Sequence, residues 1–186
     1  LVLGDALTES MPVAQRELML RALAMAHVRT TAPLLCPLPV GVAPARVQEA
    51  LSLLTSLSVP PSSVLIGHAQ HLLSDHMDLE PLRILLRQGV CLVFDGLGNT
   101  WSHVNAGPQD DEWSSPPSDK AVARAVVALV TDGFAVQLLL SHCVSSQLQL
   151  LEMGGGGFCH ISRSFLPRLR HHGLTPEHEQ QLTPRN

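Results

Sequence analysis

The stretch Val64-Leu65-Ile66-Gly67-His68 contains in five residues a pattern that recurs along this chain. Three apolar residues predict a short strand that is buried on both faces. The glycine allows the backbone to turn, and an imidazole follows where the strand ends. Four other apolar runs also end in residues with reactive or special side chains. They are residues 1–4 before Asp5, 34–36 before Pro37, 90–94 before Asp95 and 136–140 before Ser141-His142-Cys143.

Helical patterns separate these runs. In the first of them the apolar residues Leu18, Leu20, Ala22, Met25 and Ala26 recur at helical spacing among charged residues. The second begins at Pro44, a residue that is favoured in the first turn of a helix. The predicted helices cover residues 14–28, 44–54, 79–87, 119–130, 162–170 and 176–182.

Continuous apolar strands joined by helices, recurring about every thirty residues, are typical of a parallel sheet. Two α/β architectures fit this pattern, the doubly wound sheet and the (β/α)8 barrel. Both place functional residues at the carboxyl ends of the strands. No Gly-x-Gly-x-x-Gly follows a strand, so a dinucleotide site has no support. At 186 residues and 45% hydrophobic content, the chain is expected to form a single domain over residues 1–186, or part of a larger one.

Charge and composition exclude several classes of partner. The net charge of −4 argues against nucleic acid or an anionic membrane surface as the main partner. No run reaches the roughly 18 apolar residues that a membrane helix requires. The best candidate, residues 121–140, is interrupted by Asp132-Gly133. The first residues have no basic segment and no cleavage pattern, so they do not predict a signal peptide.

The four cysteines are widely separated and form no Cys-x-x-Cys pair. Cys36 and Cys91 lie inside apolar runs, where a reduced, buried thiol is more common than a disulfide. This pattern predicts a protein of a reducing compartment, and we expect a cytoplasmic location.

The side chains at the strand ends are of types that can bind a metal. Carboxylate, imidazole and thiolate are all ligands of zinc. A single imidazole at a strand end is nevertheless more often a hydrogen-bonded structural residue. A Ser–His–Asp nucleophile is less well supported, because no Gly-x-Ser-x-Gly turn is present.

Several short segments, taken in order, resemble the phosphotriesterase family of the amidohydrolase superfamily. The likeness is closest to the family's animal branch, the phosphotriesterase-related proteins. The run Met153-Gly154-Gly155-Gly156-Gly157-Phe158-Cys159-His160-Ile161 is similar to the family segment Tyr-Gly-Gly-His-Gly-Tyr-Ser-His-Ile. The other segments are Gly4-Asp5, residues 17–22, Ile66-Gly67-His68, residues 94–98 and Leu140-Ser141-His142-Cys143.

This resemblance implies a (β/α)8 barrel of the TIM type, of which the chain would supply strands four to eight. It also implies a two-metal centre, usually of zinc. In the family the ligands are a His-x-His after strand one, a carboxylate after strand four, His after strands five and six, and Asp after strand eight. The metals would activate a hydroxide that attacks an ester or amide.

Only part of that centre matches here. His68 stands at the strand-six ligand and Asp5 at the bridging carboxylate, one methylene shorter than Glu. Pro37 falls at the strand-five His and cannot ligate through its side chain, and Cys143 falls at the strand-eight Asp. We therefore take Asp5, His68 and Cys143 as candidate zinc ligands, with Asp5 and Cys143 at the catalytic positions, and expect at most one zinc. Gly156 replaces the family's loop His.

The resemblance implies a zinc-dependent hydrolase of a small N-acylated amino-acid-like substrate such as N-acetyltaurine. The substituted positions keep a second interpretation open, in which the chain is a catalytically degenerate or truncated relative that serves at most as a binding or scaffold protein. A third is an incomplete chain that does not fold alone, because five strands cannot close an eight-stranded barrel and would leave two sheet edges unpaired.

Overall fold

The computed structural model describes residues 11–73, 77–98 and 117–182. The chain divides into two compact units, Leu1–Val93 and Phe94–Asn186. The strand predicted at residues 1–4, with the candidate ligand Asp5 after it, lies outside the described residues. Each unit is considered by itself below.

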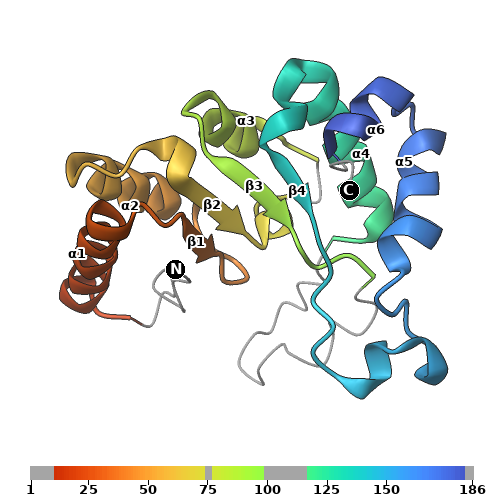
Figure 1. Ribbon diagram of the computed structural model, residues 1–186, viewed down its shortest axis with the longest axis horizontal. Coiled ribbons are helices and arrows are strands. Elements are labelled where there is room, and N and C mark those ends of the chain that lie inside the picture. The colour runs from red at the N-terminus through yellow and green to blue at the C-terminus, as the bar shows by residue number, and fades with distance from the viewer. Residues whose placement is uncertain (1–10, 74–76, 99–116, 183–186) are drawn as a thin grey trace. The chain divides into compact units, whose positions relative to one another are not determined.

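The described residues of the first unit form three parallel strands with helices between them (Figure 1). β1 pairs with β2 over four residues, from Leu34 opposite Val64 to Pro37 opposite Gly67, and β2 pairs with β3 through Leu65 and Ile66. The predicted parallel arrangement is therefore confirmed for these strands. The elements are α1 (Val13–Thr30), β1 (Leu34–Pro37), α2 (Pro44–Ser56), β2 (Val64–Gly67), α3 (Glu80–Arg87) and β3 (Cys91–Phe94).

The second unit begins at Phe94, the last residue of β3. The backbone N–H of Ser141, just after β4 (Leu138–Leu140), donates to the carbonyl of Phe94 at 2.9 Å. Phe165 and Leu169 are fully buried. The elements are α4 (Asp119–Leu129), β4 (Leu138–Leu140), α5 (Leu166–His171) and α6 (Pro176–Leu182).

Short turns of helix join these elements. Among the described residues, five are 3-10 turns and two are wider π-type turns. The 3-10 turns cover Pro61–Ser63, Ala69–Leu72, Ala135–Gln137, Gln147–Gln149 and Leu151–Met153, and the wider turns cover Val130–Phe134 and Ile161–Phe165.

The strand predicted at residues 136–140 is shorter in the structure. Gly133 has a φ of 94°, a left-handed conformation that glycine adopts without steric cost, and it ends the helical segment that continues α4. The 3-10 turn Ala135–Gln137 follows and includes the first two residues of the predicted strand. Only Leu138–Leu140 remain as β4.

The buried face of α1 differs from the one that its apolar residues suggest. Leu18 and Met25 are 68% and 65% exposed. The buried residues are Arg16, Leu20, Ala24 and His27, at intervals of three and four that form one stripe of a helix. His27 is satisfied there by a 2.8 Å hydrogen bond between its Nδ1 and the carbonyl of Ala32.

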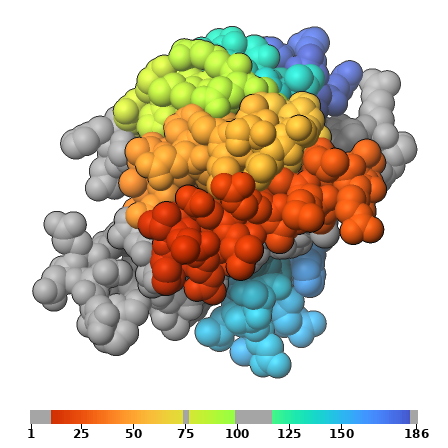
Figure 2. Space-filling view, turned by 90° about the vertical axis from the view of Figure 1, so that its left-hand side faces the viewer, coloured from red at the N-terminus to blue at the C-terminus, as the bar shows by residue number. Residues whose placement is uncertain are grey.

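Tertiary packing therefore takes precedence over local hydropathy in α1, which lies beside α2 (Figure 2). Among the described residues, α1 is the longest helix, and neither it nor any other described helix has the length and apolar character to cross a membrane.

All four cysteines are free thiols, as the sequence predicted for Cys36 and Cys91. Cys36 is 4% exposed, and burial raises the pKa of its thiol to about 12. Cys91 is half-buried rather than buried, and burial also raises its pKa. Both thiols therefore remain protonated at neutral pH.

Helix α3 provides a matched test of the packing. We expect Leu82→Ala, at a fully buried position, to lower the free energy of unfolding by about 2–5 kcal/mol, because it leaves a cavity. Ile84→Ala in the same helix changes a side chain that is 41% exposed and should cost less than about 1 kcal/mol. Urea denaturation of both variants measures the difference, and equal costs would contradict this packing of α3.

Candidate functional site

His68 follows β2 directly and has an unusual backbone conformation. Its φ of 51° and ψ of 37° place it in the left-handed region, which a residue with a Cβ seldom adopts. Such outliers gather at functional sites, where the surrounding structure stabilises them. The conformation ends the strand and starts the 3-10 turn Ala69–Leu72.

That turn brings a second imidazole, His71, next to His68. The backbone N–H of His71 donates to the carbonyl of His68 at 2.9 Å, and the two ring centroids are 5.3 Å apart. The Nδ1 of His71 lies 2.8 Å from the carbonyl of Leu38, which follows β1. A carbonyl only accepts, so the Nδ1 of His71 carries the hydrogen. This bond holds the turn after β2 to the chain after β1.

Pro37 lies at the same end of the sheet. The register places it opposite Gly67, one residue before His68, and the N–H of Leu38 donates to the carbonyl of Gly67 at 3.0 Å. Pro37, which the resemblance predicts to stand at the family's strand-five imidazole, is thus adjacent to His68 in space. Its side chain has no ligand atom.

In the second unit, the segment after β4 is organised by one buried amide, Gln149, which is 8% exposed. Its Oε1 accepts from the N–H groups of Ser145 at 2.6 Å and Ser146 at 2.9 Å. Its Nε2 donates to the carbonyl of Cys143 at 2.8 Å. The backbone at Cys143 is therefore held in place, while the residue itself is exposed.

The best-defined polar cluster of this unit joins His160 to Asp119. The Nε2 of His160 lies 2.6 Å from the Oδ2 of Asp119, and the two side chains are only 14% and 21% exposed. An ionised carboxylate can only accept, so Nε2 carries the hydrogen. The other oxygen of Asp119 accepts from the N–H of Gly98 at 3.1 Å. Three segments that are far apart in the sequence meet at this carboxylate.

Two glycines enclose the His160 ring. A Cβ built on Gly98 would lie 2.6 Å from the Cγ of His160, and one built on Gly156 would lie 2.4 Å from its Nδ1. Neither position accepts a side chain unless the ring moves. The family's loop His at the position of Gly156 is therefore incompatible with His160 as it lies here.

His142 lies in the field of this cluster. Burial, followed by repulsion from His160, lowers the pKa of its imidazole. Its Nε2 is buried and has no hydrogen-bond partner among the described residues. His142 is therefore held mainly in the neutral form, with a lone pair or an N–H group that no described side chain satisfies.

The three candidate ligands from the sequence have different positions. His68 belongs to the first unit, Cys143 to the second, and Asp5 lies outside the described residues. Within residues 11–73, 77–98 and 117–182, no group of three or more His, Cys, Asp or Glu side chains could hold a metal ion. The described residues thus do not by themselves form a metal centre, and the ligand set stays a prediction.

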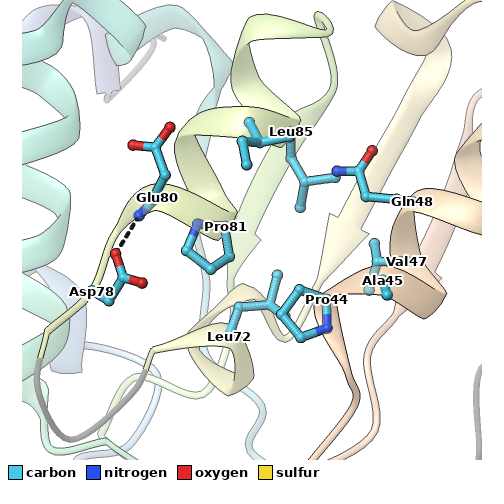
Figure 3. Close-up of a pocket in the computed structure, with 10 residues that line it drawn as sticks. Pro44, Ala45, Val47, Gln48, Leu72, Asp78, Glu80, Pro81 and Leu85 are labelled. Atoms are coloured by element: carbon cyan, nitrogen blue, oxygen red, sulfur yellow. Dashed lines mark hydrogen bonds between the residues drawn. The ribbon is translucent and has the colours of Figure 1, made fainter.

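A pocket of about 400 Å³ opens on the flank of the first unit, between α2 and α3 (Figure 3). Pro44, Leu72 and Pro81 supply apolar walls, while Asp78 caps the start of α3 by accepting from the N–H of Glu80 at 2.9 Å. Among the described residues that line this pocket, none is a candidate zinc ligand.

The His160–Asp119 pair could not have been found from local sequence. The two residues are 41 positions apart. Asp119 follows Ser118, whose side chain accepts from the N–H of Ala121, and it looks like an ordinary acidic residue in the first turn of a helix. The sequence signal for His160 was the similarity of residues 153–161 to the family segment.

The chain can now be compared with known proteins. The model of the Phosphotriesterase family matches residues 2–185. Human N-acetyltaurine hydrolase is 26% identical over 170 residues, which cover 89% of this chain and 45% of that protein. A phosphotriesterase-related protein of Drosophila persimilis is 30% identical over 125 residues, which cover 64% of this chain and 35% of that protein.

Solved structures show the same likeness. A resiniferatoxin-binding protein from Rhodobacter sphaeroides superposes with a TM-score of 0.77 at 32% identity, covering 91% of this chain and 44% of that one. The phosphotriesterase homology protein of Escherichia coli, solved with phosphate in its active site, gives a TM-score of 0.75 at 23% identity, covering 94% of this chain and 53% of that one.

The fold is thus that of a portion of a (β/α)8 barrel, as the sequence resemblance implied. The chain belongs to the phosphotriesterase family. It spans less than half the length of the hydrolase and phosphotriesterase-related relatives that it matches.

The packing of His160 can be tested by a double-mutant cycle. Gly156→Ala should lower the free energy of unfolding by about 1–3 kcal/mol, because the new Cβ collides with the ring. In a His160→Ala background the same change should cost at least about 0.5 kcal/mol less, because the collision is gone. Chemical denaturation of the four proteins gives both values, and additive costs would show that Gly156 does not pack against His160.

Proposed function

We propose that this chain is part of a zinc-dependent hydrolase of ester or amide bonds. The substrate class we propose is a small N-acylated amino acid or a similar compound, such as N-acetyltaurine. The match of residues 2–185 to the phosphotriesterase family is the observation on which the proposal depends. The names of the relatives, which include N-acetyltaurine hydrolases of Homo sapiens and Dictyostelium discoideum, support the substrate class.

His68 is the residue of this chain that best suits the role of a zinc ligand. It stands at the carboxyl end of a central strand, in the left-handed conformation that turns it away from the strand direction. His71, held by the carbonyl of Leu38, limits the space that the His68 ring can occupy. Bound zinc in such a hydrolase acts as a Lewis acid and lowers the pKa of a bound water.

A second candidate function follows from Pro37. A proline lies next to His68 where the family has an imidazole, and its peptide nitrogen and ring offer no lone pair to a metal. This substitution favours a catalytically degenerate relative that keeps the scaffold with weakened or no metal binding. Zinc content and turnover distinguish the two functions.

The chain should bind at most one zinc ion, and weakly. The reason is that Asp5, His68 and Cys143 are at most three of the five or six ligands that the family resemblance implies. Elemental analysis of purified protein after dialysis against zinc measures the content, with His68→Ala expected to reduce it and His178→Ala on α6 as the control. Two tightly held zinc ions per chain would contradict the expectation.

Hydrolysis of N-acetyltaurine by this chain should be negligible. The expected cause is the loss of the imidazole at Pro37. Release of taurine from N-acetyltaurine, followed by amine derivatisation in zinc-containing buffer, measures it. Turnover that disappears in His68→Ala but persists in His178→Ala would refute this expectation and support the hydrolase directly.

A further inference from the structure

Five cationic or titratable basic side chains gather on α4 and α5, two helices that pack against each other (Figure 1). Lys120 and Arg124 are one turn apart on α4, and both are exposed. Arg168 and His171 are on α5, and His172 follows at its C-terminal end. We call these five residues the basic surface.

The imidazole of His172 shows that the five groups converge. Its pKa is lowered by burial and then by repulsion from His171, Arg124, Lys120 and Arg168. The positive potential at His172 therefore comes from both helices.

No described carboxylate neutralises this potential. Two acids that are near these helices in sequence have other partners: Asp119 is engaged by His160, and Glu179 is engaged by Arg170 through two bonds of 2.7 and 2.6 Å. The Nε of Arg168 is buried and has no acceptor among the described residues. A buried guanidinium N–H without an acceptor is costly, and no described group offsets that cost.

Helix electrostatics explain only part of the arrangement. Cations near the C-terminal end of α5 are stabilised by its dipole, which accounts for Arg168, His171 and His172. Lys120 has no such explanation, because it lies in the first turn of α4, where the dipole favours negative charge. Lys120 and Arg124 also form a like-charge pair at positions i and i+4, which destabilises a helix.

The geometry suits a partner with several carboxylates. The exposed cations are spaced by single helical turns, the spacing at which a helix presents Glu side chains at i and i+4. A single small anion on an exposed surface stays hydrated and gains little. A long nucleic acid would extend beyond the basic surface onto a chain whose net charge is −4.

We propose that the basic surface formed by Lys120, Arg124, Arg168, His171 and His172 is a docking site for an acidic, glutamate-rich segment of another protein. The partner's carboxylates neutralise the cations of both helices. This interaction is independent of hydrolysis at the strand ends.

The test is binding of a fluorescein-labelled peptide with Glu at successive i and i+4 positions to the full chain, measured by fluorescence anisotropy at low salt. Arg124→Glu should weaken binding by about tenfold or more, because it places like charges opposite one another. Arg29→Glu is the matched control, since it makes the same charge change at an exposed residue of α1 and should alter binding less than about twofold. Circular dichroism checks that both variants fold.

A second readout follows His172. Because neighbouring cations disfavour its protonated form, Lys120→Gln should raise the pKa of His172, and saturating peptide should raise it in the unmodified chain. Titration of His172 followed by NMR measures both shifts.

Several results would overturn the proposal. Absence of peptide binding, equal weakening by Arg124→Glu and Arg29→Glu, or an unchanged pKa of His172 at saturating peptide would each do so. A single-stranded oligonucleotide of equal charge serves as competitor. If it bound more tightly than the peptide and depended on Arg124, the surface would be a nucleic-acid site instead.

Discussion

The parallel pairing of β1 with β2 determines what the carboxyl edge of the first unit can hold. Because the register aligns Pro37 with Gly67, the residue after each strand faces the same edge, and Leu38 and His68 become neighbours. The hydrogen bond from His71 to the carbonyl of Leu38 depends on that register. A slip of one residue would reverse which face each side chain occupies, so the position of His68 follows from the packing of β1 and β2.

This constraint also explains why Pro37 is tolerated. A proline inside a paired strand removes a ladder hydrogen bond, but proline is tolerated on edge strands, and β1 is at the edge of the described strands. The substitution is therefore compatible with the fold, while it removes a potential ligand beside His68. At such a position, a substitution can change the side chains available beside His68 without disturbing the fold.

Much of the fold could be predicted from the sequence, because its main signals are local. Apolar runs such as Val64 to Ile66 and the helix-starting Pro44 require only neighbouring residues to be recognised. The failures have tertiary causes. Helix α1 buries Arg16 and His27 rather than Leu18 and Met25, because packing against the rest of its unit selects the face. β4 is shortened because the turn at Gly133 places Ala135–Gln137 in a 3-10 turn.

The candidate site was less predictable, since its polar groups gain their roles from residues distant in sequence. His160 has Asp119 as a partner, and two glycines leave room for its ring. His142, after β4, has a buried nitrogen with no described partner and is repelled by His160. His172 is repelled by cations of two helices. The surroundings of these three imidazoles are thus set by residues that are distant in sequence.

His160 and His172 have different surroundings. His160 is bonded to a carboxylate of its own unit, whereas His172 is surrounded by cations. His160 has its partner within the unit: its Nε2 bonds Asp119 of α4, and that carboxylate also accepts from the N–H of Gly98. The cations around His172 have no described carboxylate partner. Glu179 of α6 is paired with Arg170, which lies on the same helix as Arg168. A carboxylate on α6 therefore neutralises Arg170, the cation outside the basic surface. The unmatched charge of the basic surface is then available to an anionic group from another molecule.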